Sequence, residues 1–132
     1  MSAQRALVLG AAGQLGKACM DSAPELVVAE GFSRVTCDVT DDAALCRVID
    51  EVDPQIVINA AAYTAVDAAE DDPESADAVN ANAPAILGAL CARRDLRLVH
   101  ISTDFVFDGR AHRPYVPAAD PVPLGIYCLL YT

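Results

Sequence analysis

The chain has 132 residues and a hydrophobic fraction of 54%, which suits one domain with a buried core and excludes a disordered chain. Its formal net charge of -10 argues against nucleic acid and against anionic membrane surfaces as partners. Five cysteines without a CxxC pair or a zinc-site spacing indicate free thiols in a reducing compartment. We therefore expect a cytoplasmic protein with no metal site and no membrane span.

Short apolar runs alternate with helical patterns from the start of the chain. Residues 5–9 form an apolar run that ends at a glycine and predicts a buried strand, and residues 14–22 predict the next helix. A second strand is expected at 26–30 and a short third strand at 34–37. Because strands that alternate with helices form parallel sheets, the expected fold is α/β, a Rossmann-like doubly wound parallel sheet.

The middle of the chain continues this alternation. Thr40 is expected to cap a helix that runs to about Val52, since two aspartates follow it in the first turn. Residues 56–59 predict a fourth strand, and residues 65–70 predict a short helical turn.

Prolines organise the remainder of the chain. Pro73 is expected to open a longer helix, and Pro84 predicts a kink or a fresh start near Asn82. Residues 96–101 predict a fifth strand, and the four prolines within residues 108–125 predict a surface loop.

Three glycines follow the first strand and open the first helix. In that context Gly10, Gly13 and Gly16 predict a turn that lets backbone N–H groups approach a pyrophosphate, although an ordinary strand–helix turn is the alternative. Glu30 lies 20 residues beyond Gly10 and is expected to accept hydrogen bonds from ribose hydroxyls, which favours NAD. Arg34 is close enough in sequence to leave both NADPH and NADH open as cofactors.

The GxxGxxG spacing resembles that of the extended short-chain dehydrogenases/reductases. Within this turn, Gln14 and Leu15 are assigned to cofactor binding together with the glycines. The resemblance implies that Asp38, with Val39 beside it, contacts the adenine, and a cap for the following helix is the alternative role for Asp38.

Two longer motifs narrow the family. INAAAYTAVDAAEDDP at 58–73 and ISTDFVFDG at 101–109 resemble the dTDP-4-dehydrorhamnose reductases. The resemblance implies an NAD(P)H-dependent oxidoreductase that reduces the C4 keto group of a dTDP-4-dehydro-6-deoxy sugar, in the last step of dTDP-L-rhamnose synthesis. A homodimer is counted among the expected assemblies.

The same resemblance implies the roles of individual residues. Thr103 matches the hydroxyl that hydrogen-bonds the substrate carbonyl, Asp104 lies beside it at the sugar, and Tyr127 matches the phenol that supplies the proton. The loop expected against the nicotinamide ribose consists of Ala60, Ala61, Ala62 and Tyr63.

The family also carries a lysine four residues after its tyrosine. Tyr131 stands there instead, and Lys17 is the only lysine of the chain. We therefore expect residues 1–132 to be an incomplete NAD(P)-binding domain, truncated before the last strands and the substrate domain, with weak or no activity. Two alternatives stay open: a non-catalytic nucleotide-binding module that resembles the regulatory subunit of methionine adenosyltransferase, and a functionless fragment.

Two further features are interpreted as structural. His100 lies in an apolar strand and is expected to be a core histidine. A cluster of carboxylates is interpreted as a solvated helix start rather than a metal site. Its members are Asp67, Glu70, Asp71, Asp72, Glu74 and Asp77.

Overall fold

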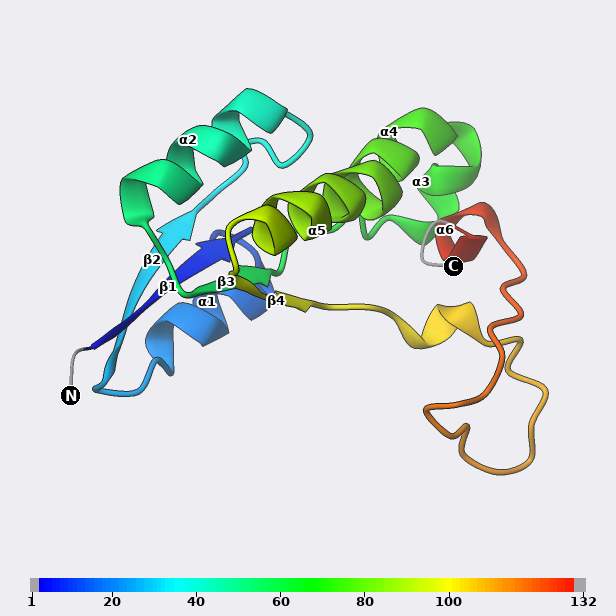
Figure 1. Ribbon diagram of the computed structural model, residues 1–132. Coiled ribbons are helices and arrows are strands. Elements are labelled where there is room, and N and C mark those ends of the chain that lie inside the picture. Colours follow the sequence, from blue (N-terminus) through cyan, green and yellow to red (C-terminus); the bar gives the residue numbers. More distant parts are fainter. Residues whose placement is uncertain (1–2, 130–132) are drawn as a thin grey trace.

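A parallel β-sheet forms the centre of the protein in this computed structural model, which describes residues 3–129 (Figure 1). Its strands are β1 (Gln4–Leu9), β2 (Val27–Phe32), β3 (Ile56–Asn59) and β4 (Arg97–His100). They are ordered β2-β1-β3-β4, and every neighbouring pair is parallel. The expected α/β fold is confirmed.

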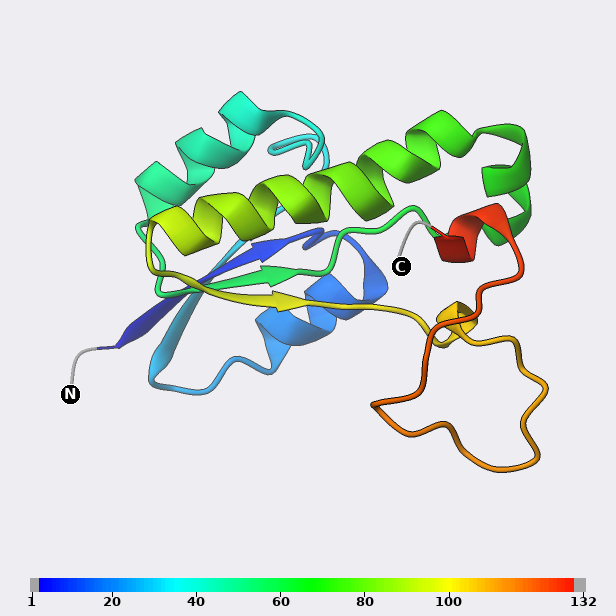
Figure 2. The same ribbon diagram turned by 45° about the vertical axis from the view of Figure 1, so that its right-hand side comes forward.

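Helices cover both faces of this sheet, as a doubly wound fold requires. Helix α1 (Gln14–Asp21) lies on one face, and α2 (Asp42–Val52) and α5 (Ala83–Arg93) lie on the other (Figures 1 and 2). From β1 the chain passes first to β2 on one side and later to β3 on the other. The order of the strands therefore reverses beside β1, and ligands of such sheets bind at the carboxyl ends of the strands at that point.

The main core lies between the sheet and the pair α2 and α5. Leu7, Leu9 and Val57 contribute fully buried side chains from β1 and β3. Each buried leucine of this kind stabilises the fold by roughly 1.5–3 kcal/mol relative to exposure. The helices contribute Leu45, Val48, Ile49, Val52, Ala83, Leu87, Leu90 and Cys91.

The expected strand at 34–37 is wrong, because this segment forms a turn. The backbone N–H groups of Thr36 and Cys37 both donate to the carbonyl of Ser33, at 3.0 and 2.8 Å. The Thr36 hydroxyl also accepts from the Ser33 N–H at 2.9 Å, a local bond that competes with strand pairing. Val35 is 95% exposed and Cys37 is buried, so these two side chains do not share one face as they would in a strand.

The cap of α2 lies one residue later than the sequence suggested. Asp41, not Thr40, caps the helix, because its side chain accepts from the N–H groups of Ala43 and Ala44 at 2.9 and 3.1 Å. Thr40 instead donates its hydroxyl to the Asp38 carboxylate. A cap of this type contributes about 1 kcal/mol.

The segment between β3 and α5 contains three short helical elements. Helix α3 (Val66–Asp71) is followed by α4 (Pro73–Asp77), in which Pro73 occupies the first turn as expected. A π-helical stretch (Ala78–Asn82) then leads into α5 with helical backbone angles at Asn82 and Ala83, so the chain changes its type of helix here and does not make the fresh start expected near Asn82. Single π-helical turns of this kind are frequent at functional sites.

Beyond β4 the chain holds little regular structure. A 3₁₀ turn, η2 (Asp104–Val106), precedes the expected surface loop, and α6 (Ile126–Leu129) follows that loop beside α3 (Figure 2). Tyr131, which stands where the family resemblance implies a lysine, lies outside the described residues. Within residues 3–129, no helix is long and apolar enough to cross a bilayer.

Candidate cofactor site

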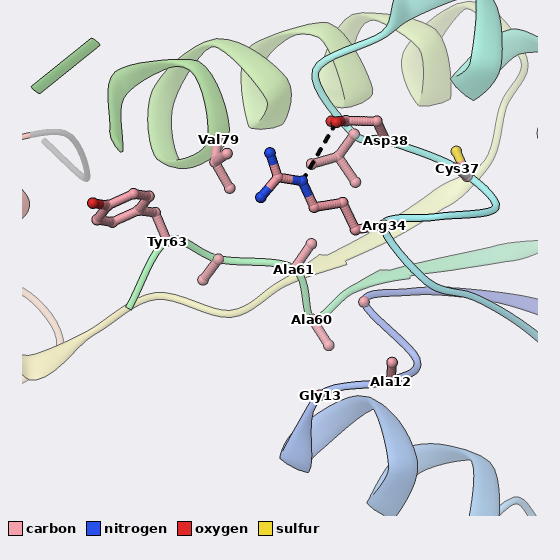
Figure 3. A pocket seen from close by; sticks show the side chains of 12 residues that line it. Ala12, Gly13, Arg34, Cys37, Asp38, Ala60, Ala61, Tyr63 and Val79 are labelled. Atoms are coloured by element: carbon pink, nitrogen blue, oxygen red, sulfur yellow. Dashed lines mark ion pairs between the residues drawn. The ribbon is translucent and has the colours of Figure 1, made fainter. Parts of the chain in front are cut away.

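A cavity of about 250 Å³ opens where the segments after β1, β2 and β3 meet (Figure 3). All three segments leave the sheet at its carboxyl edge, beside the point where the order of the strands reverses. The cavity is lined by Gly10, Ala12, Gly13, Arg34, Cys37, Asp38, Val39, Ala60, Ala61, Ala62, Tyr63 and Val79. Eight of the twelve cofactor residues assigned from the sequence therefore line one cavity.

The glycine turn leaves no space for side chains at two of its positions. Gly10 has φ +77°, and a Cβ atom there would lie 2.6 Å from the backbone nitrogen of Ala61. A Cβ atom at Gly16 would collide with the Gly10 carbonyl, so Gly16 supports the close approach of α1 to the turn. Gly16 is buried and is absent from the cavity lining.

The amino end of α1 is left open to an anion. Its capping position is Gly13, which offers no side chain to the first N–H groups, and its first turn carries no acidic residue. By contrast, α2 is capped by Asp41 and begins with Asp42. The unpaired N–H groups of a helix start attract negative charge. Gln14 and Leu15 are exposed in that first turn, outside the cavity lining.

Two buried asparagines fix the backbone of the Ala60–Tyr63 loop. The Asn59 side chain accepts from the Ala61 N–H at 3.2 Å. The Asn80 side chain accepts from the Tyr63 N–H at 2.8 Å and donates to the Tyr63 carbonyl at 2.9 Å. Asn59 and Asn80 are 1% and 3% exposed, so these bonds form away from competing water.

His100 supports the same loop from the neighbouring strand. The Asn59 amide nitrogen lies 3.1 Å from His100 Nδ1 and can only donate, so this ring nitrogen accepts. Burial lowers the pKa of His100, which favours the neutral ring that this contact needs. The ring is partly buried, so the expected core histidine also has a polar role.

An ion pair lies at the side of the cavity that the turn after β2 forms. Arg34 Nε lies 3.6 Å from Asp38 Oδ2, and the Arg34 side chain is 89% exposed. Figure 3 shows its guanidinium reaching across the cavity toward Val79. Hydrogen bonds from the Thr40 N–H and hydroxyl, with the charge of Arg34 as a smaller cause, lower the pKa of Asp38.

Glu30 lies outside this cavity, and its expected place at the end of a strand is wrong. β2 continues two residues further to Phe32, which pairs with Leu9 and packs against the core. Glu30 is exposed within the strand, opposite Leu7. The turn after Phe32 presents Arg34 and Asp38 to the cavity instead.

The two residues assigned to catalysis lie on contacting elements. Thr103 caps η2, where its Oγ1 accepts from the Phe105 N–H at 3.3 Å. The Phe105 ring meets the Tyr127 ring edge-on, with centroids 6.0 Å apart. Tyr127 is 7% exposed, and Tyr63 packs against its cluster, so a residue of the cavity wall connects the two regions.

Asp104 lines a second, more open cavity of about 480 Å³ beside α6. Phe105, Phe107 and Leu124 give this cavity apolar walls, and Asp108 adds a second carboxylate. Hydrogen bonds from the Tyr115 hydroxyl and the Arg110 N–H lower the pKa of Asp108. As far as the described chain extends, no group of three His, Cys, Asp or Glu side chains could hold a metal ion.

Several residues of the site were not assigned from the sequence. Ala12 lies between assigned glycines, so its position in the turn could have suggested it, whereas Arg34 was considered only for the choice between NADPH and NADH. Cys37 lines the cavity as a buried thiol whose pKa is raised by desolvation. Val79 and Asn80 belong to the π-helical stretch, and no local pattern in the sequence predicts that this stretch lies beside the Ala60–Tyr63 loop.

Residues 4–129 match the family model described as the RmlD substrate binding domain. A dTDP-4-dehydrorhamnose reductase of Mycolicibacterium smegmatis is 45% identical over 130 residues, which cover 95% of this chain and 38% of that protein. A dTDP-4-keto-6-deoxy-D-glucose reductase of Streptomyces niveus is 40% identical and covers 93% of this chain and 42% of its own length.

A solved structure shares the fold almost throughout. The dTDP-4-dehydrorhamnose reductase of Bacillus anthracis, in complex with NADP, superimposes with a TM-score of 0.95 at 32% identity. The match covers 99% of this chain and 47% of that one. The chain thus spans less than half the length of these relatives.

Proposed function

The chain belongs to the family of the RmlD substrate-binding domain, that of the dTDP-4-dehydrorhamnose reductases, and we propose that it forms the cofactor-binding part of an NADPH-dependent keto-sugar reductase. The observation that carries this proposal is the cavity at the carboxyl edge of the sheet, lined jointly by the glycine turn and the Ala60–Tyr63 loop. The substrate class proposed is a dTDP-4-dehydro-6-deoxy sugar. A cytoplasmic setting is part of the proposal and is supported by five cysteines without a paired spacing.

The residues present fit a dinucleotide. Side chains are excluded at Gly10, so the backbone of the turn can approach a pyrophosphate directly. The uncapped N–H groups that follow Gly13 would hold its charge. Small side chains at Ala60, Ala61 and Ala62 would let the nicotinamide ribose lie against the loop.

The reduction divides between cofactor and protein. When bound, the dihydronicotinamide supplies the hydride for the C4 carbonyl of the sugar. Thr103 Oγ1 already accepts from the Phe105 N–H, so its own hydrogen is available to the carbonyl oxygen, where negative charge develops. Tyr127 would supply the proton, and Asp104 would accept a hydrogen bond from a sugar hydroxyl.

Titration with NADPH, followed by its fluorescence, tests the cofactor proposal on the 132-residue chain. We expect saturable binding that NADP⁺ displaces. Turnover of dTDP-4-dehydrorhamnose should lie at least about 100-fold below that of the M. smegmatis relative, because Tyr131 replaces the lysine that the family resemblance implies. Absence of binding would contradict the proposal, robust turnover would refute the role given to the missing lysine, and weak but measurable turnover would exclude a non-catalytic nucleotide-binding module.

The proposed preference for NADPH over NADH rests on Arg34. The ribose 2′-phosphate distinguishes the two cofactors, and an arginine beside the second strand is a common partner for it. Arg34 lines the cavity, whereas Glu30, which would favour the free hydroxyl, is absent from its lining. The Arg34 guanidinium keeps donors free because its contact with Asp38 uses Nε alone.

Replacing Arg34 with glutamine is expected to weaken NADPH binding about tenfold and to leave NADH binding unchanged. One charge-assisted hydrogen bond at an exposed side chain is worth about 1.5 kcal/mol, which corresponds to that factor. The loss should shrink at high salt, because the guanidinium is exposed to solvent.

Arg93→Gln is the matched control, since Arg93 is exposed in the last turn of α5 and is absent from the cavity lining. Equal losses for NADPH and NADH in Arg34→Gln would contradict the assignment to the 2′-phosphate.

A further inference from the structure

Tyr127 is held in a small apolar cluster at one end of the molecule. The cluster consists of Tyr127, Ala69 and Ala76, with Tyr63 and Val66 packed against it. These alanines come from α3 and α4, so the position of the phenol depends on how α6 docks against those helices (Figure 1).

A single carboxylate connects α3 to the start of α6. Glu70 Oε1 accepts from the Ile126 N–H at 2.9 Å, across 56 positions of the sequence. Ile126 is the first residue of α6 and precedes Tyr127 directly. A Cβ atom at Gly125 would lie 3.1 Å from the same carboxylate oxygen, so the chain is tightly drawn against Glu70 here.

This contact follows the physical rule for helix starts. The first N–H groups of a helix lack partners within it, and a carboxylate satisfies one of them while complementing the positive end of the helix. Usually the cap comes from a neighbouring residue, but here it comes from another helix. The bond therefore fixes the place of α6 relative to α3, not only its local conformation.

We propose that Glu70 is a positioning residue for Tyr127: its carboxylate anchors the first turn of α6 and thereby holds the Tyr127 ring against Phe105 of η2, the turn that Thr103 caps. The inference rests on the proposed function in assigning the proton to Tyr127. It also gives a defined role to one member of the acidic cluster, which the sequence suggested was only a solvated helix start.

Three variants separate this role from general effects of charge. Glu70→Ala removes the acceptor, and Glu70→Gln keeps an acceptor oxygen at the same reach but loses the charge. Asp71→Ala is the matched control, because Asp71 is the adjacent exposed carboxylate at the end of α3.

The measurements are the hydrogen exchange of the Ile126 amide and the ring resonances of Tyr127, both by NMR. In Glu70→Ala we expect exchange at Ile126 to accelerate about tenfold or more and the Tyr127 ring signals to move. Glu70→Gln should restore most of both readings, and Asp71→Ala should change neither. NADPH affinity should stay within twofold in all three variants, because Ile126 and Tyr127, the residues of α6 whose side chains the structure describes, do not line the cofactor cavity.

Native exchange at Ile126 and native Tyr127 signals in Glu70→Ala would overturn the inference, and so would equal changes in Asp71→Ala. If Glu70→Ala does not fold, Glu70→Gln is compared with Asp71→Ala. A tenfold loss of protection of the Ile126 amide in Glu70→Gln, as large as that expected for Glu70→Ala, would contradict the inference that an acceptor oxygen at this position holds α6. Failure of every variant and of the parent chain to bind NADPH would instead contradict the proposed function, while the NMR readings still decide the role of Glu70.

Discussion

Replacing Gly10 with alanine should destabilise the fold by about 2–6 kcal/mol and abolish measurable NADPH binding. Two separate costs add at this position. A φ of +77° disfavours any side chain, which costs roughly 1–3 kcal/mol. The added Cβ would also lie 2.6 Å from the Ala61 nitrogen and 2.8 Å from the Ala60 carbonyl carbon, and such overpacking costs about 1–3 kcal/mol.

The steric part of this effect can be isolated with a second glycine. Gly109 has nearly the same dihedral, φ +70°, but a Cβ atom there would meet no atom within 4 Å. Gly109→Ala should therefore lose only about 1–2 kcal/mol and retain NADPH affinity. Urea unfolding and NADPH titration of both variants provide the comparison. Equal losses of stability would show that the Ala60–Ala61 backbone yields to the methyl group, and the close approach of turn and loop would then be refuted.

The turn at Gly10 was predictable because its signal is local. An apolar run that ends at a glycine identifies a buried strand, and glycines at the next two positions of the motif identify the turn and the helix behind it. The structure places these residues as expected, with β1 one residue longer than the predicted strand. Similar local reasoning located β3 with its observed bounds, Ile56–Asn59.

Element ends that depend on tertiary packing were less predictable. The apolar run before Glu30 stops at that residue, but β2 extends to Phe32 because this ring gains contacts with the main core. The Glu30 carboxylate consequently lies exposed within β2 and not at the end of the strand, and Arg34 lines the cavity in its place. A prediction of NAD from Glu30 alone thus depended on the position of the end of β2, which the local sequence does not determine.

Supports of the site lay beyond local reasoning altogether. Asn80 reaches the loop from 17 positions away, and Glu70 reaches α6 from 56 positions away. Both side chains belong to helical segments, and the local sequence of such a segment indicates only how the helix is capped and which of its faces meets solvent. Their functions arise from what the fold brings beside them, so only coordinates could reveal them.

The second large effect concerns Asn80, the buried amide that holds the Ala60–Tyr63 loop. Asn80→Ala should lower the free energy of unfolding by about 2–6 kcal/mol, because it leaves the N–H and the carbonyl of Tyr63 without their partner. A buried polar group without a partner costs about 1–3 kcal/mol, and two such groups are affected. Denaturation in urea measures this loss.

Asn82→Ala is the matched control, since Asn82 belongs to the same π-helical stretch but is exposed, and its side chain donates to the Asp77 carboxylate and not to the loop. Its loss should stay below about 0.5 kcal/mol. A similar loss in both variants would indicate that the helix itself, not the bond to the loop, is being weakened.

Measuring NADPH affinity separates the effect of Asn80→Ala on the shape of the loop from its effect on the stability of the fold. If Asn80 holds the loop in the shape that the cofactor needs, Asn80→Ala should bind NADPH more weakly even under conditions where the variant is fully folded. The cause is that the freed loop must be ordered again on binding, and ordering even one backbone residue costs about 1–2 kcal/mol. Unchanged affinity in the folded variant would show that Asn59 and its bond to Ala61 suffice to shape the loop, and that Asn80 serves stability alone.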